Sequence, residues 1–221
     1  TNLPGWINIP IASIISDHFQ TPCFIENDCN LAALAEATIG AGKGHSIVYY
    51  ITVSTGIGGG LCINGENISG ATGNAGEIAN IIVRECETRH ANLNSGSLES
   101  MASGLAILRA AKEKELDIKH AHEVFILASQ GNKDAFDIAE STLDSIARGM
   151  AAIAHVVDPH IFILGGGVAV SVSDFTSKIR ERYEKYVYET MRGKTEIELA
   201  KLKEPGIIGA MCMAKKQYGR L

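Results

Sequence analysis

Apolar positions along the chain follow two patterns, short continuous runs and longer stretches with helical spacing. The run over residues 47–53 is rich in β-branched and aromatic side chains and predicts a buried strand. After a glycine-rich turn, a second run ending near residue 63 predicts the returning strand. Across residues 134–157, apolar side chains recur every three or four positions, which predicts one long helix with an apolar stripe.

Shorter patterns continue this alternation along the rest of the chain. We expect a strand at 22–26, a helix at 30–39, mainly helix from 98 onward, a strand at 160–164, a helix at 174–189, a strand at 195–202 and a helix from 206 to about 218. Strands that alternate with helices indicate an α/β fold class.

Composition narrows the class of protein. The chain has 221 residues, 46% of them hydrophobic, which is enough for a sizeable core in one large domain or one and a half. It contains no apolar run of membrane-spanning length and opens with no secretory signal, so we expect a soluble, cytoplasmic protein. Its five cysteines are scattered, which favours reduced thiols. A net charge of −5 without a basic block argues against direct nucleic-acid contact by this segment.

The first strand runs into Ser54-Thr55-Gly56-Ile57-Gly58-Gly59-Gly60. Glycines beside hydroxyls suit a turn whose backbone N–H groups face phosphate, and a plain tight hairpin is the alternative. The dinucleotide pattern fails because it needs glycine at Leu61, and the Walker A pattern fails because Gly44 follows Lys43. The later Gly165-Gly166-Gly167 repeats the arrangement of strand and glycines. Two such loops indicate one nucleotide held from two sides.

The segment Glu26-Asn27-Asp28-Cys29-Asn30 lies directly before a predicted helix. In that position Asp28 can accept a proton from a substrate hydroxyl, while Asn27 bonds a neighbouring hydroxyl. The alternative is that Asp28 or Asn30 only caps the helix.

Two further carboxylates are candidates. Glu77 lies among small residues that let a loop close around a sugar, or it is an ordinary surface residue. Glu99 lies in the first turn of a predicted helix, where an acid also complements the helix dipole without any ligand. His90, His120 and His122 lack metal-like spacing and are interpreted as surface residues.

Together these segments resemble the ROK family of sugar kinases and sugar-responsive repressors, which has the actin-like, ribonuclease-H-like fold. The resemblance covers nearly the whole chain. It rests on five motifs in the family's order, namely Thr1-Asn2-Leu3-Pro4-Gly5-Trp6, Glu26-Asn27-Asp28-Cys29-Asn30 with Ala32-Ala33-Leu34, residues 54–60, residues 73–78 and Gly165-Gly166-Gly167.

The resemblance implies transfer of the γ-phosphoryl group of ATP, with Mg²⁺, to a hexose or an N-acetylhexosamine by in-line displacement. It also implies a homodimer. The implied roles are Asp28 as general base, Asn27, Glu77 and Glu99 at the other hydroxyls, Thr55 and Gly56 at the phosphates, and Gly165 and Gly166 beside the adenosine.

The family commonly holds a structural zinc through one histidine and three cysteines. In this chain Asn80, His90, Asn92 and Ser97 stand at the corresponding positions, and three of them supply neither thiolate nor imidazole. The resemblance therefore predicts no zinc at this site. The family histidine is also a sugar contact, so Asn80 is expected to bond the sugar in its place.

Family kinases open with a D-x-G-G-T turn, which this sequence lacks before Asn27. The chain therefore resembles the C-terminal two-thirds of a kinase, and we expect it to transfer phosphate poorly alone. The resemblance predicts a remnant of the first lobe and hinge at 1–42, an actin-like lobe at 43–205 and a final helix at 206–221. The alternative function is the sugar-sensing domain of a repressor of the same family.

Overall fold

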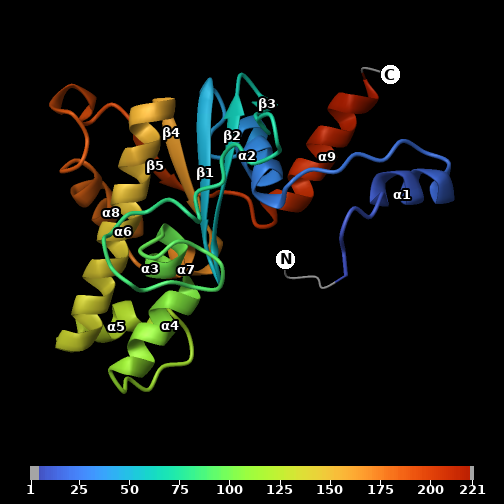
Figure 1. The fold of residues 1–221 in the computed structure, drawn as a ribbon. Helices are drawn as coiled ribbons and strands as arrows, with labels where there is room; N and C mark the ends of the chain where they lie inside the picture. The colour runs from blue at the N-terminus through green and yellow to red at the C-terminus, as the bar shows by residue number, and fades with distance from the viewer. Residues whose placement is uncertain (1–4, 220–221) are drawn as a thin grey trace.

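The computed structural model describes residues 5–219, so the Thr1–Pro4 part of the opening motif lies outside the described residues. A five-stranded sheet in the order β3-β2-β1-β4-β5 separates two groups of helices (Figure 1). The strands are β1 (Ile47–Val53), β2 (Ile57–Ile63), β3 (Glu66–Asn67), β4 (Ile161–Gly165) and β5 (Glu196–Leu199). This confirms the predicted α/β class.

The central strand β1 is buried on both faces because its side chains alternate between two cores. Tyr49 and Ile51 belong to the larger core, whereas Val48 and Tyr50 belong to the smaller one. β2 pairs with β1 in antiparallel register, and β4 pairs with it in parallel register. A continuous apolar run is therefore what this position requires.

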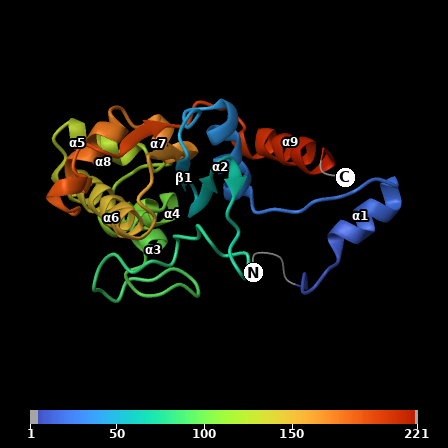
Figure 2. The same cartoon turned by 90° about the horizontal axis from the view of Figure 1, so that it is seen from above.

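Most helices cover the face of the larger core. They are α3 (Leu98–Ala102), α4 (Gly104–Glu113), α5 (Glu123–Ser129), α6 (Lys133–Val157), α7 (Gly166–Ser171) and α8 (Phe175–Tyr183). The predicted long helix is confirmed as α6, whose apolar stripe contributes Leu143, Ile146 and Met150 to this core. Figure 2 shows α6 running beside α8 on one side of β1.

The helix predicted at 174–189 is wrong in its extent, because α8 ends at Tyr183 and a short 3-10 helix follows at Glu189–Met191. The carboxylate of Glu184 accepts a hydrogen bond from the N–H of Gly193, 3.0 Å away, and so helps to turn the chain back. Helix propensity, which depends on the local sequence, does not predict a hydrogen bond between these two positions.

The opposite face carries α2 (Asp28–Ile39) and α9 (Pro205–Tyr218), which pack against each other. A Cβ on Gly209 of α9 would collide with the carbonyl oxygen of Leu31 in α2, so this glycine permits the close crossing. The final helix and the segment after residue 28 therefore form one layer.

The first described helix, α1 (Ile11–Phe19), contains no buried residue and extends away from the sheet (Figures 1 and 2). The strand predicted at 22–26 is wrong, since this segment is extended but pairs with no strand among residues 5–219. A short apolar pattern predicts extended backbone, but an extended segment is a β-strand only when a neighbouring strand pairs with it through hydrogen bonds. None of the helices between residues 5 and 219 combines the length and the apolar composition that a membrane span requires.

The glycine run of β2 brings α2 close to the sheet. A Cβ on Gly58 would lie 2.6 Å from Sγ of Cys29, and one on Gly60 would collide with the carbonyl oxygen of Cys29. On the other face, a Cβ on Gly59 would collide with the carbonyl oxygen of Gly76. Because successive strand residues alternate in direction, these glycines admit α2 on one face and the Gly76 loop on the other.

Candidate functional site: two cavities joined by one turn

The N-terminus of α2 is fixed by Asn27. Its side-chain oxygen accepts hydrogen bonds from the N–H of Cys29 at 2.8 Å and of Asn30 at 3.2 Å, which makes Asn27 the cap residue. Neither Asp28 nor Asn30, the two candidate caps from sequence, occupies the cap position. Asp28 is the first residue of the helix, and its side chain is exposed.

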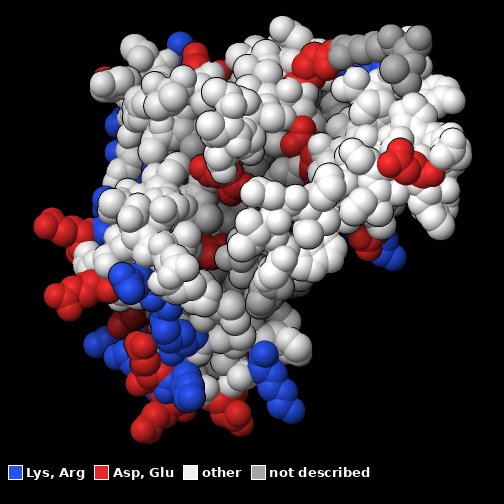
Figure 3. Space-filling model, turned by 45° about the vertical axis from the view of Figure 1, so that its right-hand side comes forward, with Lys and Arg blue, Asp and Glu red and all other residues white. Residues whose placement is uncertain are grey.

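Asp28 opens onto a cavity of about 420 Å³ between α2, the β1–β2 turn and two loops. We call it the carboxylate cavity. It brings together six of the residues singled out from the sequence, and its lining is Asn27, Asp28, Cys29, Thr52, Ser54, Thr55, Gly56, Ile57, Gly58, Glu77 and Glu99. In Figure 3 acidic side chains lie in the recessed middle of the face, while lysines and arginines gather towards its lower end.

The carboxylates of this cavity influence one another. Partial burial and the negative charges of Asp28 and Glu99 raise the pKa of Glu77 above its ordinary value. Glu77 is held by Asn27, whose side-chain amide donates to Oε1 of Glu77 over 3.2 Å. Three carboxylates facing one cavity make a surface of hydrogen-bond acceptors that suits a ligand rich in hydroxyls.

Glu99 connects α3 to the turn. Its Oε2 accepts a hydrogen bond from the N–H of Ile57 at 2.8 Å, which fixes the carboxylate beside Gly56. A Cβ on Gly56 would lie 2.6 Å from that oxygen, so glycine is needed at this position for the approach of Glu99. Glu99 therefore fastens the turn and lines the carboxylate cavity at the same time.

Asn80 is not brought to the carboxylate cavity. Its Oδ1 accepts a hydrogen bond from the N–H of Asn94 at 2.6 Å, so the side chain closes its own loop. Of the other positions aligned with zinc ligands, Ser97 donates through its hydroxyl to Ser100 at 2.7 Å. The described part of the chain, residues 5–219, holds no group of three or more His, Cys, Asp or Glu side chains suited to a metal ion.

A second cavity, of about 300 Å³, lies on the other side of the β1–β2 turn, and we call it the α4–α7 cavity. Its lining is Ser54, Thr55, Gly104, Leu105, Leu108, Lys119, His120, Ala121, His122, Gly167, Val168 and Ser171. Ser54 and Thr55 line both cavities. The N–H of Gly104 donates to the Ser54 carbonyl at 2.7 Å, which fastens the shared turn to the start of α4.

The three glycines at the junction of β4 and α7 divide into two groups. A Cβ on Gly165 would collide with the Tyr50 hydroxyl, and one on Gly166 would lie 2.5 Å from the carbonyl oxygen of Val53, so both glycines let α7 pack on β1. Gly167 has nothing within 4 Å of its Cβ position and lines the cavity. Of these three glycines, the cavity lining therefore includes Gly167 and not the Gly165 and Gly166 expected from the motif.

Sequence reasoning missed Lys119, His120 and His122 as cavity residues. The two imidazoles lie nearly parallel, with ring centroids 5.7 Å apart and an interplanar angle of 10°. Their polar segment favours a surface position, and His120 is indeed exposed. Only the fold carries the loop before α5 to the mouth of the α4–α7 cavity. A closely spaced Lys-His-Ala-His was the one signal available beforehand.

Comparison with known proteins agrees with this geometry. The family model described as "ROK family" matches residues 1–217. The chain belongs to the ROK family. A glucokinase of Thermotoga maritima is 31% identical to it, with 99% of this chain and 74% of that protein covered.

Two solved structures extend the comparison. The ROK hexokinase of Thermus thermophilus superposes with a TM-score of 0.86 at 31% identity, covering 96% of this chain and 72% of that one. A ROK family glucokinase of Streptomyces griseus in complex with glucose and AMPPNP superposes with a TM-score of 0.82 at 28% identity, covering 96% of this chain and 74% of that one. The actin-like ATPase fold expected from the motifs is thereby confirmed.

Regulators also match this ROK chain. A xylose repressor of Bacillus spizizenii is 27% identical over 87% of this chain and 50% of its own length. The matches therefore support a sugar kinase or a sugar-responsive regulator in general.

Proposed function

We propose that this ROK protein functions in ATP-dependent phosphorylation of a hexose or an N-acetylhexosamine. The observation that carries the proposal is that Asp28, Glu77 and Glu99 face one cavity, and that Ser54 and Thr55 line both this cavity and a second one. A hydroxyl acceptor on one side of the turn and a phosphoryl donor on the other would meet at Thr55.

In this proposal Asp28 takes the proton of the attacking sugar hydroxyl. The side chain is exposed to the cavity, and one of its oxygens is held by the N–H of Cys29 at 2.8 Å. Asn27, Glu77 and Glu99 hold the remaining hydroxyls, each being already fixed by a bond to its neighbours. Holding the sugar in place supplies much of the rate, because transfer is mainly a matter of positioning.

The α4–α7 cavity suits ATP. Leu105, Leu108 and Val168 give it apolar walls that fit a planar base, and the turn at Thr55 and Gly56 lies at the end towards the sugar. In this proposal Gly165 and Gly166 act on the adenosine side indirectly, because they set α7, whose Gly167 lines the cavity, against β1. ATP, with Mg²⁺ at its phosphates, would supply the transferable phosphoryl group. The Streptomyces griseus relative, whose structure is a complex with glucose and AMPPNP, supports this choice of ligands.

A sugar-sensing domain of a regulator is the second candidate, favoured by the match to a xylose repressor. A regulator requires sugar binding but no proton acceptor. The intact Asp28, set beside the sugar-holding side chains and near an intact Ser-Thr-Gly turn, favours catalysis.

The test is a panel of hexoses and N-acetylhexosamines incubated with ATP and Mg²⁺ and the intact gene product, with ADP release as readout. We expect one or two sugars to support turnover at saturating ATP. Calorimetry with the same panel separates the two candidates. Sugar binding without any ADP release would favour the regulator, and neither binding nor release would reject both.

A further inference from the structure

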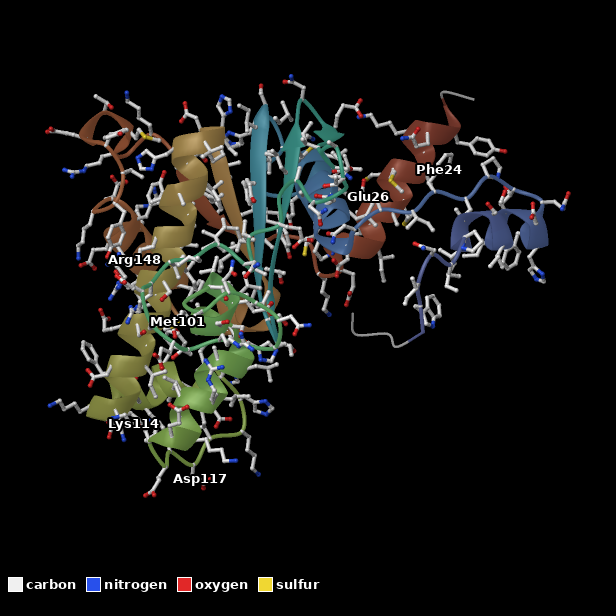
Figure 4. All side chains as sticks on the ribbon, in the orientation of Figure 1. Phe24, Glu26, Met101, Lys114, Asp117 and Arg148 are labelled. Atoms are coloured by element: carbon white, nitrogen blue, oxygen red, sulfur yellow. The ribbon has the colours of Figure 1, made fainter. Side chains whose placement is uncertain are left out.

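Glu26 contacts both segments that build the carboxylate cavity but does not line that cavity. It lies at the end of the extended segment that leads into α2, where this segment meets the main body, whereas Phe24 lies further out (Figure 4). Its side chain is half-buried.

Both carboxylate oxygens of Glu26 accept hydrogen bonds. Oε1 accepts from the N–H of Asn27 at 2.9 Å and from the side-chain amide of Asn30 at 3.0 Å. Oε2 accepts from the hydroxyl of Ser69 at 2.8 Å. Burial raises the pKa of Glu26, but these bonds outweigh it and hold the pKa below its usual value, so the group stays ionised.

These bonds close a ring between two distant segments. Ser69 begins the loop that ends at Glu77, and its carbonyl accepts from the N–H of Ala75 at 3.1 Å. At the other end, Glu77 accepts from the side chain of Asn27. The loop is thus attached to the segment before α2 at both ends, through Glu26–Ser69 and through Asn27–Glu77.

We propose that Glu26 is a positioning residue, which sets the separation between Asp28 and Glu77 by attaching the Ser69–Glu77 loop to the start of α2. This inference rests on the proposed function. Side chains that hold reacting groups through a second set of bonds contribute strongly to geometry, because small displacements at the reacting centre cost much rate.

The experiment compares Glu26→Gln, Ser69→Ala and Ser69→Thr in the intact gene product. Glutamine keeps the shape of Glu26 but replaces one of its two acceptor oxygens by an NH2 donor. Depending on the orientation of the amide, this donor faces either the hydroxyl of Ser69 or the donors of Asn27 and Asn30, and those hydrogen bonds are lost. We expect kcat/KM to fall about tenfold or more in Glu26→Gln. Ser69→Ala should raise the KM for sugar with a smaller change in kcat, since it frees the Ser69 end of the loop and leaves Glu77 held only through Asn27, and Ser69→Thr should restore the KM.

The matched control is Glu85→Gln, an exposed glutamate away from both cavities, which should leave kinetics unchanged. Unfolding temperatures of the same variants, measured in parallel, distinguish a positioning role of Glu26 from a role in stability alone. If Glu26→Gln lowers stability but the folded enzyme keeps wild-type kcat and KM, the proposal is wrong. If the wild type shows no turnover with any sugar, the proposed function fails. Calorimetric sugar affinities of the same variants then still test Glu26, and equal affinities would reject its role.

Discussion

The side-chain amide of Asn27 donates a hydrogen bond to Oε1 of Glu77 over 3.2 Å, across 50 positions of sequence. The same Asn27 caps α2 through its oxygen. One side chain therefore fixes the start of the helix that presents Asp28 and one of the carboxylates opposite it. The sequence offered Asp28 or Asn30 as the helix cap, but Asn27 fills that position and leaves the Asp28 side chain facing the carboxylate cavity.

Replacing Asp28 by asparagine tests the proposed base. Asparagine cannot take a proton from the sugar hydroxyl, whereas the cap at Asn27 stays intact, so the fold should be retained. We expect kcat to fall by about a hundredfold or more, with the sugar dissociation constant changing only a few-fold. Steady-state kinetics and calorimetry measure the two quantities. Unchanged turnover would mean that Asp28 contributes only to the first turn of α2 and not to proton transfer.

Glu77→Gln should show a pH-dependent change in stability. The pKa of Glu77 is raised, so its ionisation costs the folded state free energy as the pH rises from the ordinary value of 4.5 through the raised one. Wild type therefore loses stability across that window, and Glu77→Gln does not. We expect the variant to unfold at a higher temperature at pH 7, with the difference disappearing below pH 4.5, and to bind sugar more weakly. A constant difference at every pH would show that ionisation of Glu77 is not the cause.

Gly60→Ala tests whether the glycine run serves packing. The added methyl would collide with the Cys29 carbonyl and lie 2.8 Å from the N–H nitrogen of Asn30, both backbone atoms of α2. We expect the free energy of unfolding to fall by about 1–3 kcal/mol. Gly167→Ala is the control, since nothing lies within 4 Å of its Cβ position, and about 0.5 kcal/mol or less is expected. Chemical denaturation measures both, and equal effects would refute the packing role.

Glu36→Ala should be among the most destabilising substitutions in α2. Glu36 is 0% exposed, and its carboxylate accepts from the N–H of Ala41 at 2.7 Å and of Leu202 at 2.9 Å. Alanine would remove the acceptor of two partly buried N–H donors, at a cost of about 2–4 kcal/mol. The exposed Glu113 supplies the control, because Glu113→Ala should change stability by about 0.5 kcal/mol or less. Chemical denaturation measures both variants, and a cost at Glu36 as small as that at Glu113 would contradict the assignment.

The double variant His120→Ala/His122→Ala tests the donor side. If the parallel imidazoles contact the nucleotide, the KM for ATP should rise about five- to tenfold while the KM for sugar stays constant. His90→Ala, which lies outside both cavities, should change neither. A change in the sugar KM alone would show that the α4–α7 cavity does not receive ATP.

The sequence predicted well wherever short-range pattern decides structure. The strands at Ile47–Val53 and Ile57–Ile63 and the long helix at Lys133–Val157 are confirmed, because burial on both faces or along one stripe leaves a period in the sequence. The strand predicted near Phe24 is wrong, and the helix predicted at 174–189 is wrong in its extent, since α8 ends at Tyr183. In both, the deciding factor is a partner, or its absence, elsewhere in the chain.

The candidate site divides in the same way. Motif order was enough to single out Asp28 and Glu77, which the fold does bring to one cavity. It could not reveal that Asn80 bonds Asn94, because that contact depends on how a loop closes. Nor could it place His122 in the lining of the α4–α7 cavity, since nothing local distinguishes a histidine on open surface from one beside a cavity.

By itself, the sequence determined the α/β class, the main strands and helices, the family and the identity of the carboxylates, because these follow from periodicity and from residue types in a fixed order. Tertiary structure alone decided which side chains face one another. It showed that most of the glycine run admits α2 and a neighbouring loop to the sheet, and that the Ser54–Thr55 turn divides two cavities. Distances between segments far apart in the chain arise from packing, which no local pattern encodes.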